Sequence, residues 1–398
     1  MRYKISLRID IWLFRVFLFI FVLTSFNREL LFFGVDFRYV GFALEVFLLL
    51  LGLTRNEFVI RIGKLEKMFL GFYLLVLVSN LAWEFNDLIV EPELMFNLSV
   101  LNIYNFLAFL VFWLYKEHID SEELSRMILI SGVVLLLSMI WVYTGNTFPE
   151  YITRASRTMT VDNGLGEHHN LFGQGFRVAG FAEDANYATL FCVISIATAL
   201  YHTKKVILRV VLCIAFAFGA SISFSRTILL GTFFALLIVN IHRVFPELDN
   251  LVNRCFVFGT FILSIILPFL GLQNMLQTVS TRFMFWRNAA DLFLRSPLIG
   301  NGLGAFRHYQ SSLYNYTWYV QCHNTWWQIL SEHGLIAAVL MIYILVFELT
   351  HVSSNYKKFS VILLSVFFCS CETVYLQIFV LIFYVIFCSK QSISKSGR

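Results

Sequence analysis

Long apolar runs recur along almost the whole chain, and they constrain its fold more than any other feature. A helix needs about 20 mostly apolar residues to cross the roughly 30 Å hydrocarbon core of a bilayer. With 59% hydrophobic and 14% charged residues, the chain has too little polar surface for a water-soluble globule. The sequence therefore predicts an all-α polytopic membrane protein with about twelve transmembrane helices, at about residues 10–26, 38–53, 67–84, 97–115, 126–144, 185–201, 206–222, 226–241, 254–271, 326–349, 357–373 and 374–389.

The lysines indicate an orientation for these helices. When the N-terminus is placed in the cytoplasm, all ten lysines fall on the cytoplasmic side, and the basic residues of the outer side are all arginines. Cytoplasmic loops of membrane proteins are enriched in positive charge, so we expect both termini inside. The outer side then carries two loops too long to be simple connectors, 145–184 and 272–325. We expect a single transmembrane domain, 1–398, that bears both loops.

The second outer loop predicts an amphipathic helix followed by turns. Three charged residues recur at every fourth position and share one helix face: Arg287, Asp291 and Arg295. Pro297 ends this helix, and the glycines within 300–304 indicate turns rather than a nucleotide loop, because no Gly-Lys-Ser/Thr follows. The loop closes on His323 and Asn324 immediately before a new apolar run, which fixes a histidine where loop meets membrane.

Arginines on the outer side are candidates for binding phosphate. A guanidinium donates two parallel hydrogen bonds and keeps its charge, which suits a lipid-linked pyrophosphate at headgroup level. The alternative is contact with anionic headgroups or nearby carboxylates. Arg226 lies in a short polar hinge between two apolar runs, where a charge is costly unless it is paired, functional or able to reach the interface. The arginines expected on or near this side are Arg154, Arg157, Arg177, Arg226, Arg282, Arg287, Arg295 and Arg307.

Four further polar residues near these arginines are candidates for chemistry. His323 can take a proton from an acceptor hydroxyl near neutral pH, although a lone histidine can also be structural. Asn324 can orient the histidine ring or a sugar. Glu183 and Asp184 stand at a predicted helix N-terminus, where an acidic residue either caps the helix or serves as a general base.

Several other classes of site lack support in the sequence. His168 and His169 have no third ligand at a recognisable spacing, and the 7 cysteines form no Cys-x-x-Cys pair, so we expect no metal. No ATPase motif is present, so any transferred group must arrive already activated. The net charge of +5 reflects topology rather than nucleic-acid binding, because no basic run accompanies it.

The order of three short motifs resembles the O-antigen ligase and O-antigen polymerase superfamily of bacterial inner-membrane glycosyltransferases. The motifs are RVAGF at 177–181 with DAN at 184–186, SFSRT at 223–227, and residues 282–304 followed by HNTW at 323–326 and EHGL at 332–335. The resemblance covers roughly residues 175–350. The chain departs from it at Glu183 and Asp184, where relatives often have Pro-Asn.

The resemblance implies a C-type glycosyltransferase fold that works without metal or nucleotide cofactors. It implies that Arg177, Arg226 and Arg282 or Arg287 hold the donor pyrophosphate, and that His323 faces the acceptor. The implied partners are an undecaprenyl-pyrophosphate-linked oligosaccharide, a glycan acceptor, membrane lipids and a candidate chain-length regulator. The implied location is the inner membrane, with the active site facing the periplasm.

Three functions remain open at this point. The first is a polymerase of O-antigen or another surface polysaccharide, which joins lipid-linked repeat units by inverting transfer. The second is a ligase that moves the glycan to the lipid A core. The third is a transporter or flippase of lipid-linked oligosaccharide, for which charges near the bilayer midplane would be expected. Arg15, Glu45 and Arg209 are the residues that would favour transport if they lined a central cavity.

Overall fold

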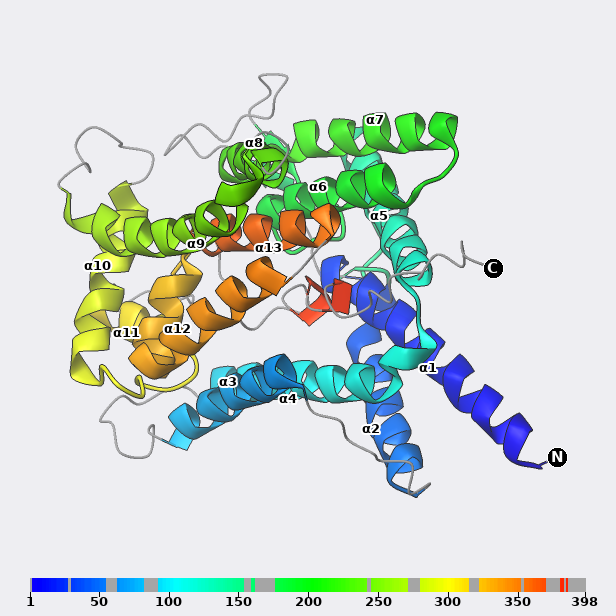
Figure 1. Cartoon of the computed structure of the whole chain (residues 1–398), viewed down its shortest axis with the longest axis horizontal. Helices are drawn as coiled ribbons and strands as arrows, with labels where there is room; N and C mark the ends of the chain where they lie inside the picture. The colour runs from blue at the N-terminus through cyan, green and yellow to red at the C-terminus, as the bar shows by residue number, and fades with distance from the viewer. Residues whose placement is uncertain are drawn as a thin grey trace. The chain divides into compact units, whose positions relative to one another are not determined.

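The computed structural model of the chain consists of helices and two small hairpins (Figure 1). It describes residues 2–27, 30–54, 63–81, 92–153, 159–161, 176–241, 245–270, 280–314, 322–351, 354–369, 380–382 and 384–385. These residues fall into two compact units. The first comprises 1–60, 104–229 and 380–398, and the second comprises 61–103 and 230–379.

Helices α1, α2, α5, α6 and α7 form most of the first unit. They span Arg2–Phe26, Phe37–Thr54, Ser121–Tyr143, Ala185–His202 and Val206–Ser223. The second half of α4 (Pro92–Tyr115) and the 3-10 helix η2 (Lys116–His118) also belong to this unit. Two antiparallel hairpins complete it, β1 (Leu31–Phe32) with β2 (Val35–Asp36) and β3 (Met159–Val161) with β4 (Phe176–Val178).

Small residues let α5, α6 and α7 approach one another closely. A Cβ added to Gly132 of α5 would lie 2.6 Å from the Oγ of Ser195 on α6. One added to Gly219 of α7 would lie 2.8 Å from the Sγ of Cys192 on α6. Glycine at helix crossings is typical of membrane helices, whose association depends on close van der Waals contact. This packing fixes the ends of α6 and α7, where β4 lies.

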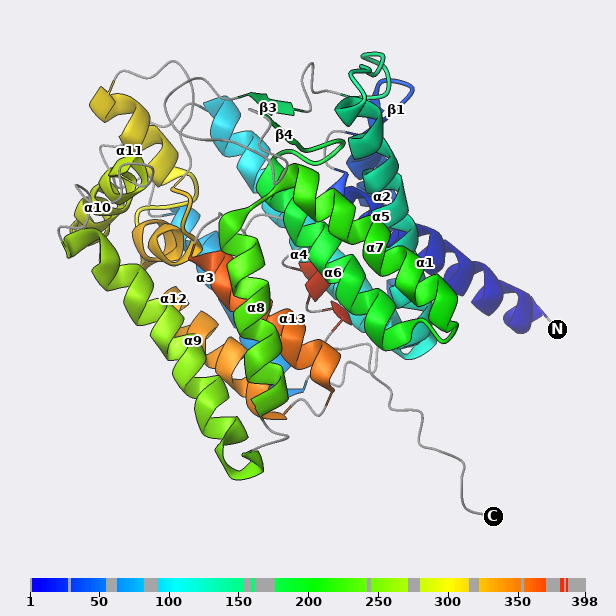
Figure 2. The same cartoon turned by 90° about the horizontal axis from the view of Figure 1, so that it is seen from above.

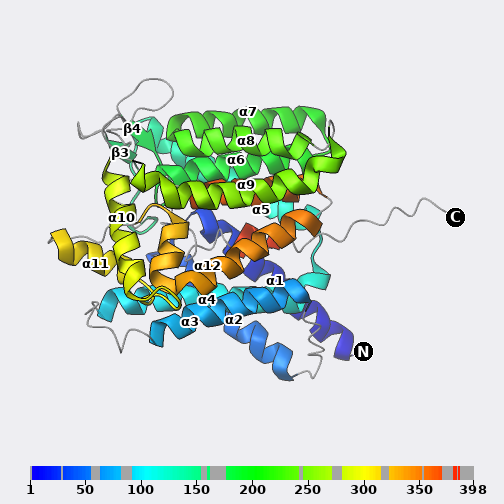
Figure 3. The ribbon, with the colours of Figure 1, turned by 60° about the vertical axis from the view of Figure 1, so that its left-hand side comes forward.

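Helix α12 (Thr325–His351) organises the second unit. It packs against α3 (Lys64–Leu81), α9 (Asp249–Ile266), α10 (Ser280–Arg295) and α13 (Asn355–Phe368) (Figure 3). The unit also contains the first half of α4, most of α8 (Arg226–Ile241), and α11 (Ala305–Tyr314). Two 3-10 helices flank α9, η3 (Pro246–Leu248) and η4 (Leu267–Phe269).

Each unit carries lysines at the opposite end of its helices from the candidate site residues. In the first unit, Lys204 after α6 lies 3.2 Å from Glu122 at the start of α5, whereas β4 reaches the beginning of α6. In the second unit, Lys358 pairs with Asp249 at the start of α9, whereas α10 packs against η4 at the other end of α9. An 18-residue helix is about 27 Å long, so about the thickness of a hydrocarbon core separates the two ends.

The helices agree with the predicted apolar runs, with two differences. Six helices among the described residues are long and apolar enough to cross a membrane, α1, α5, α6, α7, α9 and α12. The count of about twelve spans stays a prediction, and most of run 374–389 lies outside the described residues. A helix, α11, forms in the passage after Pro297 where the sequence predicts turns, and α12 has a break that its apolar pattern does not predict.

Candidate functional site

Arg177 joins two of the three sequence motifs in the first unit. It lies on β4, which contacts α5, α6 and α7 (Figure 2). Its Nε donates to the carbonyl oxygen of Ser223 at 2.7 Å, and its Nη2 donates to Oδ1 of Asn186 at 3.0 Å. The Ser223 carbonyl belongs to the last turn of α7, which has no helical donor and carries the negative end of the helix dipole. The half-buried guanidinium therefore stabilises the end of α7.

A hydroxyl network fixes the turn between α7 and α8. The Oγ1 of Thr189 on α6 lies 2.8 Å from the Oγ of Ser223 and accepts the backbone N–H of Ser225 at 3.1 Å. All three side chains are buried. Phe224, between the serines, has φ 36°, in the left-handed region that a bulky side chain rarely adopts. Arg226 is the first residue of α8 and has an exposed side chain.

The two acidic residues before α6 differ in their surroundings. Asp184 is the N-cap of α6, and its side chain accepts the backbone N–H of Asn186. The capping interpretation of Asp184 is therefore confirmed. Glu183 is exposed.

In the second unit, α10 packs against the segment that carries His323. Trp286 donates from Nε1 to the carbonyl oxygen of Cys322 at 3.0 Å. The ring centroids of Phe285 and His323 lie 6.5 Å apart, with the rings inclined by 29°. Arg287, on the same helix, donates from Nε to the carbonyl oxygen of Pro268 in η4 at 2.9 Å. Arg282 lies in the first turns of α10 and is half-buried.

Asn324 holds the start of α12 in place. Its Oδ1 accepts the backbone N–H of Trp327 at 3.1 Å, the geometry of a helix N-cap, and its Nδ2 donates to the Oγ of Ser264 at 2.7 Å. The indole of Trp327 donates to the Ser264 carbonyl at 3.1 Å. His323 precedes this cap with φ 54° and is half-buried. Strained backbone of this kind clusters at functional sites.

A backbone crossing interrupts α12 at Gly334. This residue has φ 78° and ψ −178°, so α12 consists of two helical parts. Residues 297–302 pass through the break: Gly302 N–H donates to the Glu332 carbonyl at 2.9 Å, and Leu335 N–H donates to the Pro297 carbonyl at 2.8 Å. A Cβ on Gly300 or Gly334 would lie 2.3 Å from backbone of the other segment. Positions 300 and 334 therefore require glycine, because the two backbone segments are in direct contact there.

Two side chains of the EHGL motif, Glu332 and His333, are buried at this break. The Oε1 of Glu332 accepts the Phe306 N–H at 3.2 Å and so ties α12 to the start of α11. The Nδ1 of His333 lies 2.7 Å from the Oγ of Ser79 on α3. Adjacent Glu332, His333 and Gly334 were a usable signal, whereas Ser79 could not be paired with them from spacing alone. His308 lies in α11.

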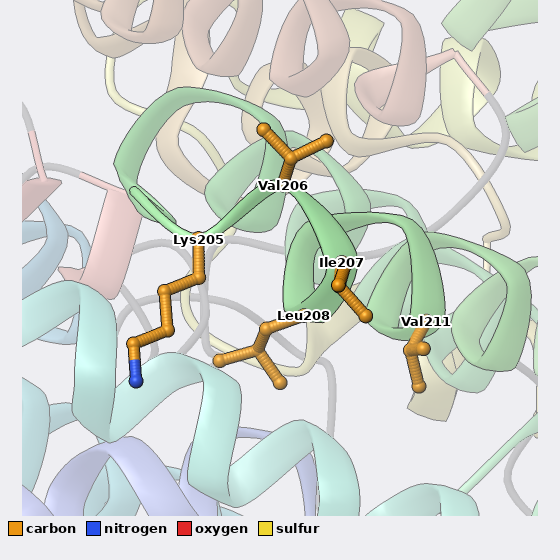
Figure 4. Close-up of a pocket in the computed structure, with 5 residues that line it drawn as sticks. All are labelled: Lys205, Val206, Ile207, Leu208 and Val211. Carbon is orange, nitrogen blue, oxygen red and sulfur yellow. The ribbon is translucent and has the colours of Figure 1, made fainter.

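Two further features of the described residues concern metal ions and surface hollows. No group of three or more His, Cys, Asp or Glu side chains among them could hold a metal ion. An open hollow of about 540 Å³ lies at the start of α7, lined by Lys205, Val206, Ile207, Leu208 and Val211 (Figure 4). Its lining is mostly apolar, and it is at the other end of α7 from Ser223. Arg154, Arg157, His168 and His169 lie outside the described residues.

Comparison with known proteins identifies one matching family. Residues 210–342 match the model of the O-antigen ligase family, which is about a third of the chain. No curated protein and no solved structure matches the chain. The matching segment runs from α7 to the second part of α12, so Arg177, Glu183 and Asp184 precede it. It contains Arg226, Arg282, Arg287, His323 and Asn324.

Proposed function

Because residues 210–342 match the O-antigen ligase family, we propose that the chain is a polymerase of O-antigen or a related surface polysaccharide. One observation carries the proposal. Three of the described residues other than glycine have a positive φ, and two of them lie at the candidate site. Phe224 stands two residues before Arg226, and the other is His323 itself. Both lie inside the segment that matches the family, and strained backbone is maintained only where the surroundings enforce it.

The proposed reaction joins two lipid-linked glycans at the periplasmic face of the inner membrane. The acceptor hydroxyl oxygen attacks the anomeric carbon of the donor, and the bond from that carbon to the pyrophosphate oxygen breaks. Undecaprenyl pyrophosphate leaves with the electron pair, and configuration inverts. His323 takes the hydroxyl proton as general base. Asn324, through its cap of α12, keeps the neighbouring histidine in place.

The arginines are proposed to stabilise the leaving pyrophosphate. The candidates that the sequence predicts for this role are Arg177, Arg226, Arg282 and Arg287. Fixed cationic donors aimed at developing charge lower a barrier without the reorganisation that water would need. The contacts of Arg177 and Arg287 with backbone carbonyls hold their side chains in defined positions, which favours this role over loose headgroup contact.

The first prediction concerns Arg226 and His323. Arg226→Ala and His323→Gly are expected to insert normally and to lower glycan transfer about a hundredfold or more, in line with losses of a general base or charge stabiliser. Glycine is chosen at His323 because it accepts φ 54° without strain. The measurement is the size ladder of surface polysaccharide, resolved on a gel, from a deletion strain that carries each variant.

Arg126→Ala is the matched control. This exposed arginine forms a surface ion pair with Glu122, and exposed ion pairs contribute about 0–1 kcal/mol to stability. In the uncomplemented deletion strain, collapse of the ladder to core with a single repeat unit identifies a polymerase. Polymer that persists on the lipid carrier but never reaches lipid A identifies a ligase instead. Wild-type ladders from both site variants would refute the assigned site.

A transporter of lipid-linked oligosaccharide is the second candidate, and one residue favours it. Glu45 on α2 is fully buried, and neither carboxylate oxygen has a hydrogen-bond partner among the described residues. Ionisable groups within membrane helices often mark transport paths. The other two residues that would favour transport are engaged locally, because Arg15 pairs with Glu123 at 2.7 Å and Arg209 donates to the Thr203 carbonyl. An unchanged ladder in the deletion strain would favour transport.

A further inference from the structure

We infer that Asn288, Gln310 and Tyr314 form a subsite for a sugar residue of the acceptor glycan; this inference rests on the proposed function. The three side chains meet between α10 and α11, which pack against each other and against α12 within the second unit. Nδ2 of Asn288 donates to Oε1 of Gln310 at 2.9 Å and to the hydroxyl of Tyr314 at 3.4 Å. These three residues are called the amide cluster below.

Gln310 supplies a buried donor that the described residues leave unused. Its side chain is 0% exposed, and its Nε2 has no hydrogen-bond partner among the described residues. A buried donor without an acceptor destabilises the fold, because the group has lost its contacts with water and gained none in return. An oxygen atom of a bound ligand would supply the missing acceptor.

The amide cluster reaches the protein surface at Tyr314. This residue is the last of α11 and is 41% exposed, and Asn288 is half-buried. Gln310 and Tyr314 are four residues apart, so they lie side by side on α11. A distance of 3.4 Å is long for a hydrogen bond, so little is lost when a ligand oxygen replaces the Tyr314 hydroxyl beside the two amides.

The chemistry of the amide cluster fits a sugar better than a phosphate. Amide and phenol groups carry both hydrogen-bond donors and acceptors, and sugar hydroxyls likewise donate and accept. A phosphate offers acceptors, and its strongest contacts come from charged donors such as arginine. The cluster therefore suits the hydroxyl-bearing part of a lipid-linked glycan and not its pyrophosphate.

The position of the amide cluster assigns this sugar to the acceptor. Phe285 and Asn288 are three residues apart on α10 and share one face of that helix. The ring of Phe285 lies beside that of His323, with 6.5 Å between the centroids. A sugar bound at Asn288 would lie one helical turn from the proposed general base, where the attacking hydroxyl is required.

The test measures transfer by the full-length protein in detergent, with lipid-linked repeat units extracted from the source strain. Gln310→Met keeps the length of the side chain but removes its amide, so KM for the repeat unit should rise about tenfold, the effect of one hydrogen bond, with kcat within about twofold of wild type. The melting temperature should change little, because the variant removes an unsatisfied donor together with the bond from Asn288. Asn288→Ala, at a half-buried position, should raise KM in the same way.

A direct binding measurement uses the repeat-unit oligosaccharide released from its lipid carrier. Its affinity, measured by titration calorimetry, should fall about tenfold in Gln310→Met, whereas inorganic pyrophosphate should bind both proteins equally. Ser312→Ala is the matched control. This exposed side chain donates only to the Tyr309 carbonyl, and it lies two residues from Gln310 on the other side of α11, so its loss should leave both KM and affinity unchanged.

The outcomes separate the subsite from the proposed function. If Gln310 only ties α11 to α10, Gln310→Met lowers the melting temperature and leaves KM and affinity at their wild-type values. That result, with transfer by the wild type intact, would overturn the inference and leave the proposed function standing. Weaker oligosaccharide binding in Gln310→Met, without any transfer by the wild type, would support the sugar subsite and overturn the proposed function.

Discussion

At the scale of single residues, the site residues have structural partners that the sequence could not reveal. Asn324 was expected to orient the histidine ring or a sugar, and it is the N-cap of α12 with a second bond to Ser264, 60 residues away. Asp184 was predictable as a cap because an N-cap and its partner are neighbours in sequence. Hydrogen bonds across helices have no such local signature, so the partners of Asn324 and Arg177 had to come from the structure.

Two substitutions of Asn324 should distinguish the contributions of its two hydrogen bonds to stability. Asn324→Ala loses both the cap and the bond to Ser264 and should lower the free energy of unfolding by about 2 kcal/mol, about 1 for each. Asn324→Asp keeps a cap oxygen but loses the donor to Ser264, so an intermediate loss is expected. Thermal unfolding in detergent measures both. Equal stability of wild type and the alanine variant would contradict the described role.

At the scale of elements, hydropathy predicted where helices lie but not how they are interrupted. The apolar pattern continues across Gly334, so the sequence predicted one helix where the structure has two parts. The segment that forms α11 was read as turns because glycines precede it. The amphipathic helix around Arg287 was correctly predicted, since its buried face follows the helical period and α10 ends at Arg295, before Pro297.

Gly334→Ala should damage this crossing severely. A methyl group there would meet the Leu298 carbonyl oxygen at 2.3 Å and would adopt φ 78°. Overpacking and left-handed strain together should cost about 2–5 kcal/mol, seen as a lower melting temperature or loss of folded protein. Gly259→Ala, in α9, has nothing within 4 Å of the added methyl group and should be neutral or slightly stabilising. Similar losses in both variants would argue against the crossing.

At the scale of the whole molecule, the membrane class followed from the apolar runs, and the motif order predicted a resemblance that the family match over residues 210–342 supports. The arrangement of the helices within each unit could not be predicted from the sequence. It depends on contacts such as that of Gly219 with Cys192, which hydropathy does not encode. What the structure adds to the predicted topology is that lysines and candidate site residues lie at opposite ends of the helices in both units. The assignment of these ends to cytoplasm and periplasm stays a prediction.

Cysteine labelling tests that assignment. In a variant whose native cysteines are replaced, Asn146→Cys should react with a membrane-impermeant maleimide in intact spheroplasts, because residue 146 follows the predicted outer end of α5. Lys204→Cys, after the other end of α6, should react only when the membrane is permeabilised. The positive-inside bias gives the expected direction, and the opposite labelling pattern would invert the topology.

The break in α12 also has a mechanical consequence. The helical part from 325 to 333 stands between the Asn324 cap and the crossing at Gly334, so its length alone sets the height and rotation of His323 above the crossing. One inserted residue there would turn the histidine by about 100° and lift it by about 1.5 Å. On the other side of the crossing, the rest of α12 can tilt to suit bilayers of different thickness. We expect the backbone hydrogen bonds of the crossing to keep His323 in position when the rest of α12 tilts.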